Sequence, residues 1–278
     1  MQYIVTGGGG FIGSNLVDEL ISDNHEVIVI DDLSSGRKEN INPKAIFIEG
    51  RVDRKILSLW SPDVIFHLAA QSRIQPSFEN PYYTHCANVD GTIEVLEAAR
   101  KRKNIKIIFA GTSCAYQSQY DNPYALSKFV AEHYCKMYAN LYGVSVGIAR
   151  FFNVYGPRQM EEGSHSTVIG IFERQKRNNQ NLTITGTGEK RRDFIHVKDI
   201  VSGLVFMSRQ VWKGDVFDFG SGINYSIKEV AEMFHHAIEH IPERVGEADF
   251  TLADTSLAKN ILGWEPKINL EDYIKSIL

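Results

Sequence analysis

The sequence predicts an α/β protein built on a doubly wound parallel sheet. Short apolar runs rich in β-branched residues recur along the first half of the chain, and segments with helical apolar spacing separate them. A glycine-rich turn at residues 7–13 directly follows the first run. Strands buried on both faces read as continuous apolar runs, so we expect these runs to be neighbouring parallel strands.

The expected elements alternate in order along the chain. The first strand is expected at residues 3–5, and a helix over residues 11–21 follows it. The next strands are expected at residues 27–30, 46–48, 64–66, 106–109 and 144–149. Two longer helices are expected at residues 84–100 and 124–142.

The texture of the sequence changes after Arg150. Loops rich in Gly, Asn and charged residues, at 156–163 and 178–181, separate shorter periodic segments. We therefore expect a large domain over residues 1–150 and a smaller C-terminal α/β lobe over residues 151–278, with chain crossing between them. A cleft between two lobes is a usual place for a ligand.

Composition and charge narrow the function classes. The 278 residues include 30 basic and 34 acidic side chains, giving a net charge of −4, which argues against a dedicated nucleic-acid surface. The chain shows neither a signal-peptide pattern nor an apolar run of the ~18 residues that a membrane span needs. Three cysteines lack metal-ligand spacing. We expect a cytoplasmic protein with reduced thiols that binds no nucleic acid, membrane or metal.

The glycine turn has the spacing of a Rossmann-type dinucleotide site. Gly7 would make the tight turn, Gly10 would let a pyrophosphate approach the backbone, and Gly13 would allow close helix packing. The helix that follows points its amides at phosphate. Asp31 ends the next strand and can accept from both ribose hydroxyls, which favours NAD over NADP, although Arg37 could weaken that preference. A glycine turn without a ligand is the alternative.

Tyr124 and Lys128 form a YxxxK pair, and residues four apart share one face of a helix. An ammonium beside a phenol lowers the tyrosine pKa from about 10 toward a range in which it acts as a base. Thr112 and Ser113 follow the strand expected at 106–109, where open α/β sheets carry their chemistry. The alternative is an ordinary surface pair.

Ten motifs run in order along nearly the whole chain: TGGGGFIGS (6–14), DDLSSG (31–36), HLAA (67–70), NVDGT (88–92), YALSK (124–128), RFFNVYGPR (150–158), RRDFIHVKD (191–199), FGSG (219–222), RVGE (244–247) and LGWEPK (262–267). This ordered set resembles the extended short-chain dehydrogenase/reductase family, and within it the NAD-dependent nucleotide-sugar 4-epimerases. The resemblance is specific for the family and says less about the substrate.

The resemblance implies roles for individual residues. Tyr124 would be the base, Lys128 would hold the cofactor ribose, and Thr112 would hydrogen-bond the sugar O4. The implied NAD-binding residues are Gly7, Gly10, Phe11, Ile12, Gly13, Asp31, Asp32, Ser35, Gly36, Val52, Leu68, Ala69, Ala70, Asn88, Tyr124 and Lys128. The implied substrate-binding residues are Thr112, Ser113, Asn153, Arg158, Arg192, Arg244, Glu247 and Thr251.

Within the substrate set, the resemblance assigns the diphosphate to Asn153, Arg192 and Arg244, and the nucleotide ribose to Glu247. Two arginines and an amide suit a diphosphate because they supply charge-assisted hydrogen bonds. A solvated surface charge is the alternative for each arginine taken singly.

Three segments depart from the family pattern. The 4,6-dehydratases carry Thr-Asp-Glu where this chain has Thr112-Ser113-Cys114, so an elimination lacks its acid and base. The loop at 117–123 is shorter than usual, which would open the site, change the substrate or signal lost activity. Arg51 replaces an acid expected near the adenine, so either Asp53 takes over that contact or the affinity for the cofactor falls.

These observations predict C4 epimerisation of a UDP-sugar through a 4-keto intermediate. Thr251 is small, so N-acetylhexosamines are expected beside glucose and galactose. The alternatives are a nucleotide-sugar dehydratase, decarboxylase or 4-ketoreductase, or a non-catalytic NAD sensor. The helices at 84–100 and 124–142 resemble a pair that forms a four-helix bundle between subunits in this family, which predicts a homodimer; packing within one chain is the alternative.

Overall fold

A seven-stranded parallel sheet is the largest element of the computed structural model, which describes residues 1–102 and 104–278. The strand order is β10-β6-β5-β4-β1-β2-β3. The strands are β1 (Gln2–Thr6), β2 (Glu26–Asp31), β3 (Ile46–Glu49), β4 (Val64–His67), β5 (Lys106–Thr112), β6 (Ser145–Phe151) and β10 (Lys213–Phe219). The winding direction reverses between β1 and β4, as in a doubly wound fold, and the predicted fold class is confirmed.

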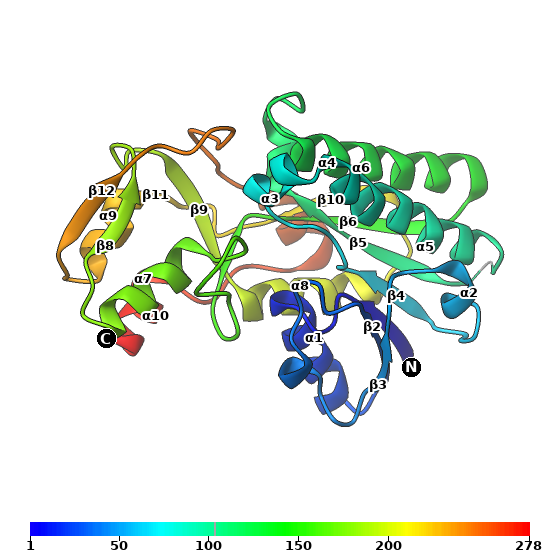
Figure 1. Cartoon of the computed structure of the whole chain (residues 1–278). Helices are drawn as coiled ribbons and strands as arrows, with labels where there is room; N and C mark the ends of the chain where they lie inside the picture. The colour runs from blue at the N-terminus through cyan, green and yellow to red at the C-terminus, as the bar shows by residue number, and fades with distance from the viewer. Residues whose placement is uncertain (103) are drawn as a thin grey trace.

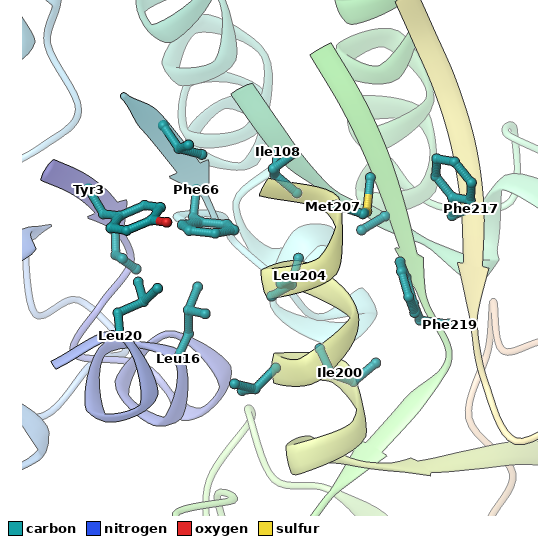
Figure 2. Close-up of a cluster of buried hydrophobic side chains, with 14 of the residues drawn as sticks. Tyr3, Leu16, Leu20, Phe66, Ile108, Ile200, Leu204, Met207, Phe217 and Phe219 are labelled. Atoms are coloured by element: carbon teal, nitrogen blue, oxygen red, sulfur yellow. The ribbon is translucent and has the colours of Figure 1, made fainter. Parts of the chain in front are cut away.

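Helices cover both faces of this sheet (Figure 1). α1 (Phe11–Ser22) and α8 (Val197–Ser208) lie on one face, and α4 (Pro81–His85), α5 (Gly91–Arg100) and α6 (Pro123–Tyr142) lie on the other. Leu16 and Leu20 of α1 and Leu204 of α8 point at the strand side chains (Figure 2). Each such side chain stabilises the fold by about 1.5–3 kcal/mol when it leaves water.

Local sequence sets the two ends of α6. The Asn122 side chain accepts from the Ala125 amide at 2.7 Å, and Pro123 occupies the first turn. Gly143 ends the helix in the left-handed region at φ 66°. Tyr124 is thereby held in the first turn of α6, beside the carboxyl end of β5.

The helix expected at 84–100 differs from the prediction in its interior. A π-helical turn, Cys86–Asp90, joins α4 to α5. The wider turn places Asn88 in the interior, where it bonds both the amide and the carbonyl of Gln71, at 2.7 and 3.0 Å, and the Ser127 hydroxyl at 2.9 Å. Apolar periodicity cannot reveal one extra residue in a turn.

The smaller lobe contains two short sheets with helices around them. One sheet has β7 (Asn153–Tyr155), β9 (Arg191–His196) and β11 (Asn224–Ser226), and the other has β8 (Leu182–Thr185) and β12 (Ile238–Ile241). The helices are α7 (Val168–Arg177), α9 (Ile227–Met233) and α10 (Leu270–Ile277). Residues 197–219, assigned by sequence to this lobe, lie with the large sheet because β10 pairs with β6. None of the helices in the described ranges could span a membrane.

A buried carboxylate connects three segments of the smaller lobe. Asp193 on β9 accepts from the Ser221 amide and hydroxyl at 2.7 and 2.8 Å, and from the amides of Gly222 and Ala253 at 3.0 Å each. Its own amide donates to the Thr251 hydroxyl at 3.2 Å. Because buried donors are costly to leave unpaired, this one side chain fixes the walls that carry Arg192 and Thr251.

We predict that Asp193→Ala lowers the free energy of unfolding by about 2–4 kcal/mol, because several buried donors lose their acceptor. Chemical denaturation monitored by circular dichroism measures the change. The matched control is Asp215→Ala, whose carboxylate is exposed and accepts from the Lys213 amide at 2.7 Å. It should stay within about 0.5 kcal/mol of the parent. Equal effects of the two substitutions would contradict this role of Asp193.

Candidate active site

A cavity of about 990 Å³ extends from the glycine turn to the smaller lobe. It lies at the carboxyl ends of the strands, where open α/β sheets bind ligands. The predicted site residues that line it are Gly7, Gly10, Phe11, Ile12, Gly13, Asp31, Asp32, Ser35, Val52, Leu68, Ala69, Ala70, Thr112, Ser113, Tyr124, Lys128, Asn153, Arg192, Arg244, Glu247 and Thr251. Three predicted residues, Gly36, Asn88 and Arg158, do not line it.

The glycine turn brings α1 against β1 without side chains between them. A Cβ on Gly13 would lie 2.1 Å from the Gly7 carbonyl oxygen, which no side chain permits. Gly7 itself has φ +74°, in the left-handed region. Gly10 precedes α1 and provides no side-chain cap, so the first amides of the helix remain open toward the cavity.

Asp31 links this turn to the end of β2. Its two oxygens accept from the amides of Gly9 and Leu33, at 2.8 and 2.9 Å. Burial raises the pKa of Asp31, and the two amides lower it. Gly36 lies directly against the Asp31 carboxylate. A side chain at position 36 would clash with it, because a Cβ there would lie 2.7 Å from Asp31 Oδ1.

Arg51 forms the wall beyond Asp31. Its guanidinium lies 3.6 Å from the Asp32 carboxylate and stacks over the Tyr83 ring at 5.1 Å. Asp53, the suggested substitute for the missing acid, instead caps α2 (Arg54–Leu57) by accepting from the Lys55 amide at 2.6 Å, and it does not line the cavity. The Asp53 side chain is therefore engaged in the helix cap.

The structure brings Thr112, Tyr124 and Lys128 to one part of the cavity. Thr112 ends β5 and borders the cavity with Tyr124, and its hydroxyl lowers the pKa of the Tyr124 phenol. Lys128 lies one turn further along α6, with Nζ 4.1 Å above the Phe109 ring. Burial lowers the pKa of Lys128 to about 8.

The pKa of Tyr124 corrects one sequence expectation. Burial raises it, so the direction is opposite to that predicted from the YxxxK pair. The cation that opposes this rise is Arg73 rather than Lys128. Arg73 lies in the loop after β4 and belongs to none of the motifs. Its position after the carboxyl end of a strand was the one feature of the sequence that could have identified it as a site residue.

Arg73 also joins the two lobes across the cavity. Its Nε donates to the His165 carbonyl at 3.0 Å. The His165 ring meets the Gln71 side chain at 2.8 Å, and Gln71 is in turn held by Asn88. Asn88 thus acts by positioning Gln71, although the sequence placed it among the cofactor contacts.

The smaller lobe supplies a wall of positive charge. Arg192 and Arg244 lie 3.9 and 4.0 Å from the same carboxylate, Glu247. Burial lowers the pKa of Arg192. The Asn153 amide donates to the Asp193 carbonyl at 2.8 Å and borders the cavity. Arg158 faces away, because its guanidinium pairs with Asp18 of α1 at 2.6 Å, so a substrate contact is not supported for it.

Comparison with known proteins places the chain in a family. The model of the NAD dependent epimerase/dehydratase family matches residues 3–220. The chain belongs to this family.

Relatives match over nearly the full length. A Methanocaldococcus jannaschii protein is 38% identical and is matched over 99% of this chain and 96% of the relative. A UDP-glucose 4-epimerase of Mycolicibacterium smegmatis is 35% identical, with the same coverage of 99% and 96%. The crystal structure of a Thermotoga maritima UDP-glucose 4-epimerase with UDP-glucose has a TM-score of 0.94 at 33% identity, covering 99% of this chain and 96% of that one.

The cavity of this NAD dependent epimerase/dehydratase fits the dinucleotide. The uncapped first turn of α1 and the carboxylate of Asp31 both border the cavity, where they provide backbone donors for a pyrophosphate and acceptors for a ribose. No cluster of three or more His, Cys, Asp or Glu residues in the described ranges is arranged to hold a metal ion.

Asp31→Asn is expected to weaken NAD binding about 10- to 100-fold. The side-chain nitrogen of the asparagine would face a backbone amide, which is also a donor, and the ribose hydroxyls would lose a charged acceptor. Isothermal titration calorimetry with NAD measures this. Asp23→Asn is the matched control. Asp23 is exposed at the end of α1 and does not line the cavity, so its loss should change NAD affinity by less than about twofold. An equal loss in both variants would refute the assignment of Asp31.

Lys128→Met should raise the free energy of unfolding at pH 7 while abolishing turnover. The folded lysine has a pKa of about 8 and the unfolded one about 10.4, so holding the charge in the folded state at pH 7 costs on the order of 1–3 kcal/mol. Above pH 8 the unfolded chain binds more protons, so the parent gains stability and the difference between the two proteins should shrink by about pH 10. Thermal unfolding across this pH range tests it.

The control for this prediction is Lys101→Met, which removes an exposed lysine at the end of α5. It should change the unfolding free energy by less than about 0.5 kcal/mol at each pH. A destabilised Lys128→Met protein at pH 7 would show that the ammonium contributes more to packing than it costs by burial.

Proposed function

We propose that this chain catalyses NAD-dependent inversion at C4 of a UDP-sugar. One observation carries the proposal: Thr112, Tyr124 and Lys128 converge in a cavity that extends from a dinucleotide cradle to Arg192 and Arg244. The named 4-epimerase relatives and the family membership support it.

In this proposal Tyr124 takes the proton from the C4 hydroxyl, which Thr112 orients through its own hydroxyl. Arg73 favours the phenolate because its positive charge lowers the pKa of Tyr124, and Lys128 holds the cofactor ribose. NAD, when bound, accepts and returns the hydride. Asn153, Arg192 and Arg244 hold the diphosphate, a tether about which the 4-keto sugar turns to present its other face.

Cys114 favours epimerisation over dehydration. It stands where the dehydratases carry the second acid of their pair, and burial raises the pKa of its thiol. A neutral thiol neither donates nor accepts a proton readily near pH 7, so water elimination lacks its catalyst.

Two features bear on the sugar. Within the short loop at 117–123 only Gln117 lines the cavity, and Tyr120 is 90% exposed, so the loop leaves much of the site uncovered. Thr251 borders the cavity and leaves room beside the sugar ring. We propose that both hexoses and N-acetylhexosamines fit; activity on UDP-hexoses with none on UDP-N-acetylhexosamines would refute the role of Thr251.

We also propose a homodimer in the cytoplasm. α4 and α6 expose apolar side chains on the outer side of the helical layer, among them Tyr82, Leu141 and Tyr142. The three cysteines are free thiols, as a reducing compartment requires. A monomeric mass by light scattering at micromolar concentration would refute the dimer.

Tyr124→Phe should lose at least about 1,000-fold in turnover, because the general base is removed, while NAD affinity changes little. The assay incubates the protein with UDP-, dTDP- and GDP-sugars and follows C4 inversion by product analysis, with absorbance checked for net reduction of NAD. Leu126→Ala, an exposed change on the same helix, is the control. Unchanged conversion by Tyr124→Phe would discard the mechanism, and net cofactor reduction would indicate an oxidoreductase.

A further inference from the structure

Arg73 has more hydrogen-bonding capacity than the chain uses. Its Nε is taken by the His165 carbonyl at 3.0 Å. Its two terminal amino groups form no hydrogen bond or ion pair within the described residues 1–102 and 104–278, and the side chain lines the cavity. A guanidinium presents a planar fork that matches a carboxylate with two parallel bonds. The free side of this fork therefore faces the ligand.

The other cations of the cavity already have partners. Arg192 and Arg244 share Glu247, and Lys128 lies over the Phe109 ring. The remaining acids that line the cavity lie elsewhere: Asp31 ends β2 and Asp32 follows it, and Asp90 and Glu94 lie on the π-helical turn and α5. Arg73 forms no ion pair with a carboxylate of the described residues, and its planar fork borders the cavity. A half-buried guanidinium without a counterion favours an anionic ligand.

The position of Arg73 identifies which part of the ligand it meets. Arg73 immediately precedes α3 (Ile74–Glu79), whose Ser77 hydroxyl accepts from the Tyr124 amide at 3.1 Å, and the side chains of Arg73 and Tyr124 both line the cavity. In the proposed reaction this phenol meets O4 of the sugar. On a pyranose ring C4 neighbours C3, which carries a neutral hydroxyl, and C5, which carries C6. A carboxylate at C6 is the only anionic group of a common nucleotide sugar that lies so near C4.

We propose that Arg73 binds a C6 carboxylate, so that UDP-hexuronic acids are the substrates this site selects. The inference rests on the proposed function, since it assumes that Tyr124 meets O4. Arg73 then has two roles. Its Nε binds the loop that carries His165, and its terminal amino groups bind the carboxylate of the sugar. Gln71 holds the same loop independently at 2.8 Å, so the loop stays in place when the fork is replaced.

The test compares Arg73→Gln and Arg73→Lys with the parent on UDP-hexuronic acid and on UDP-hexose. The parent should prefer the hexuronic acid in kcat/KM. Arg73→Gln should reduce the ratio of the two kcat/KM values about 10- to 100-fold, with most of the loss in KM for the hexuronic acid. Any effect on Tyr124 is common to both sugars and cancels in this ratio. Arg73→Lys should recover only part, because it restores the charge without the fork.

Calorimetry with UDP alone provides the second readout. Arg73→Gln should bind UDP within about twofold of the parent, whereas Arg244→Gln should weaken UDP and both UDP-sugars alike. A parent that prefers the neutral sugar, equal losses on the two sugars, or weaker UDP binding by Arg73→Gln would overturn the proposal; the last result would place Arg73 on the diphosphate.

The two proposals fail separately. If the parent inverts no UDP-sugar, or converts the hexuronic acid to a pentose with release of carbon dioxide, C4 epimerisation of that substrate is wrong. Binding of UDP-hexuronic acid relative to UDP, measured by calorimetry in the parent and in Arg73→Gln, still decides whether Arg73 reads the carboxylate.

Discussion

The absence of a side chain at Gly13 is the constraint on which the site depends. Because the Gly7 carbonyl would lie 2.1 Å from a Cβ there, α1 can begin directly against β1 only if that position is glycine. The same approach aims the first turn of α1 at the cavity and lets Asp31 bond the turn. It also places Leu16 and Leu20 against the sheet, beside α8. One missing methyl group thus serves both the core and the cofactor cradle.

The sequence predicted the parts of this molecule that depend on local pattern. Apolar runs located six of the seven large-sheet strands, and the spacing of Tyr124 and Lys128 identified two residues that line the cavity. The sequence expected chain crossing between the lobes but did not identify β10 as the crossing strand, because its pairing with β6 is a long-range choice that periodicity does not record. Arg158 was misplaced for a similar reason: a motif match cannot show that Asp18, on a distant helix, has taken its charge.

Electrostatics was the least predictable level. The YxxxK spacing predicted an ammonium that lowers the pKa of a phenol, yet burial raises the pKa of Tyr124 and lowers that of Lys128. Desolvation depends on every atom around a group, and a sequence motif names only two. Arg73 entered the site from a loop without any motif. The cavity therefore holds its charges at a cost in stability, which is usual where side chains are arranged for chemistry.

The repeated passage of the chain between the two lobes limits how the cavity can open. β6 leads into β7, β9 into α8, and β10 into β11, so separate stretches of backbone join the lobes. A hinge on one connection can swing widely, whereas several connections must bend together and resist wide separation. Ligands would then reach the cavity by movement of its loops, above all of the loop that carries His165. A molecule with this mechanical design suits a large cofactor held between lobes that cannot move far apart.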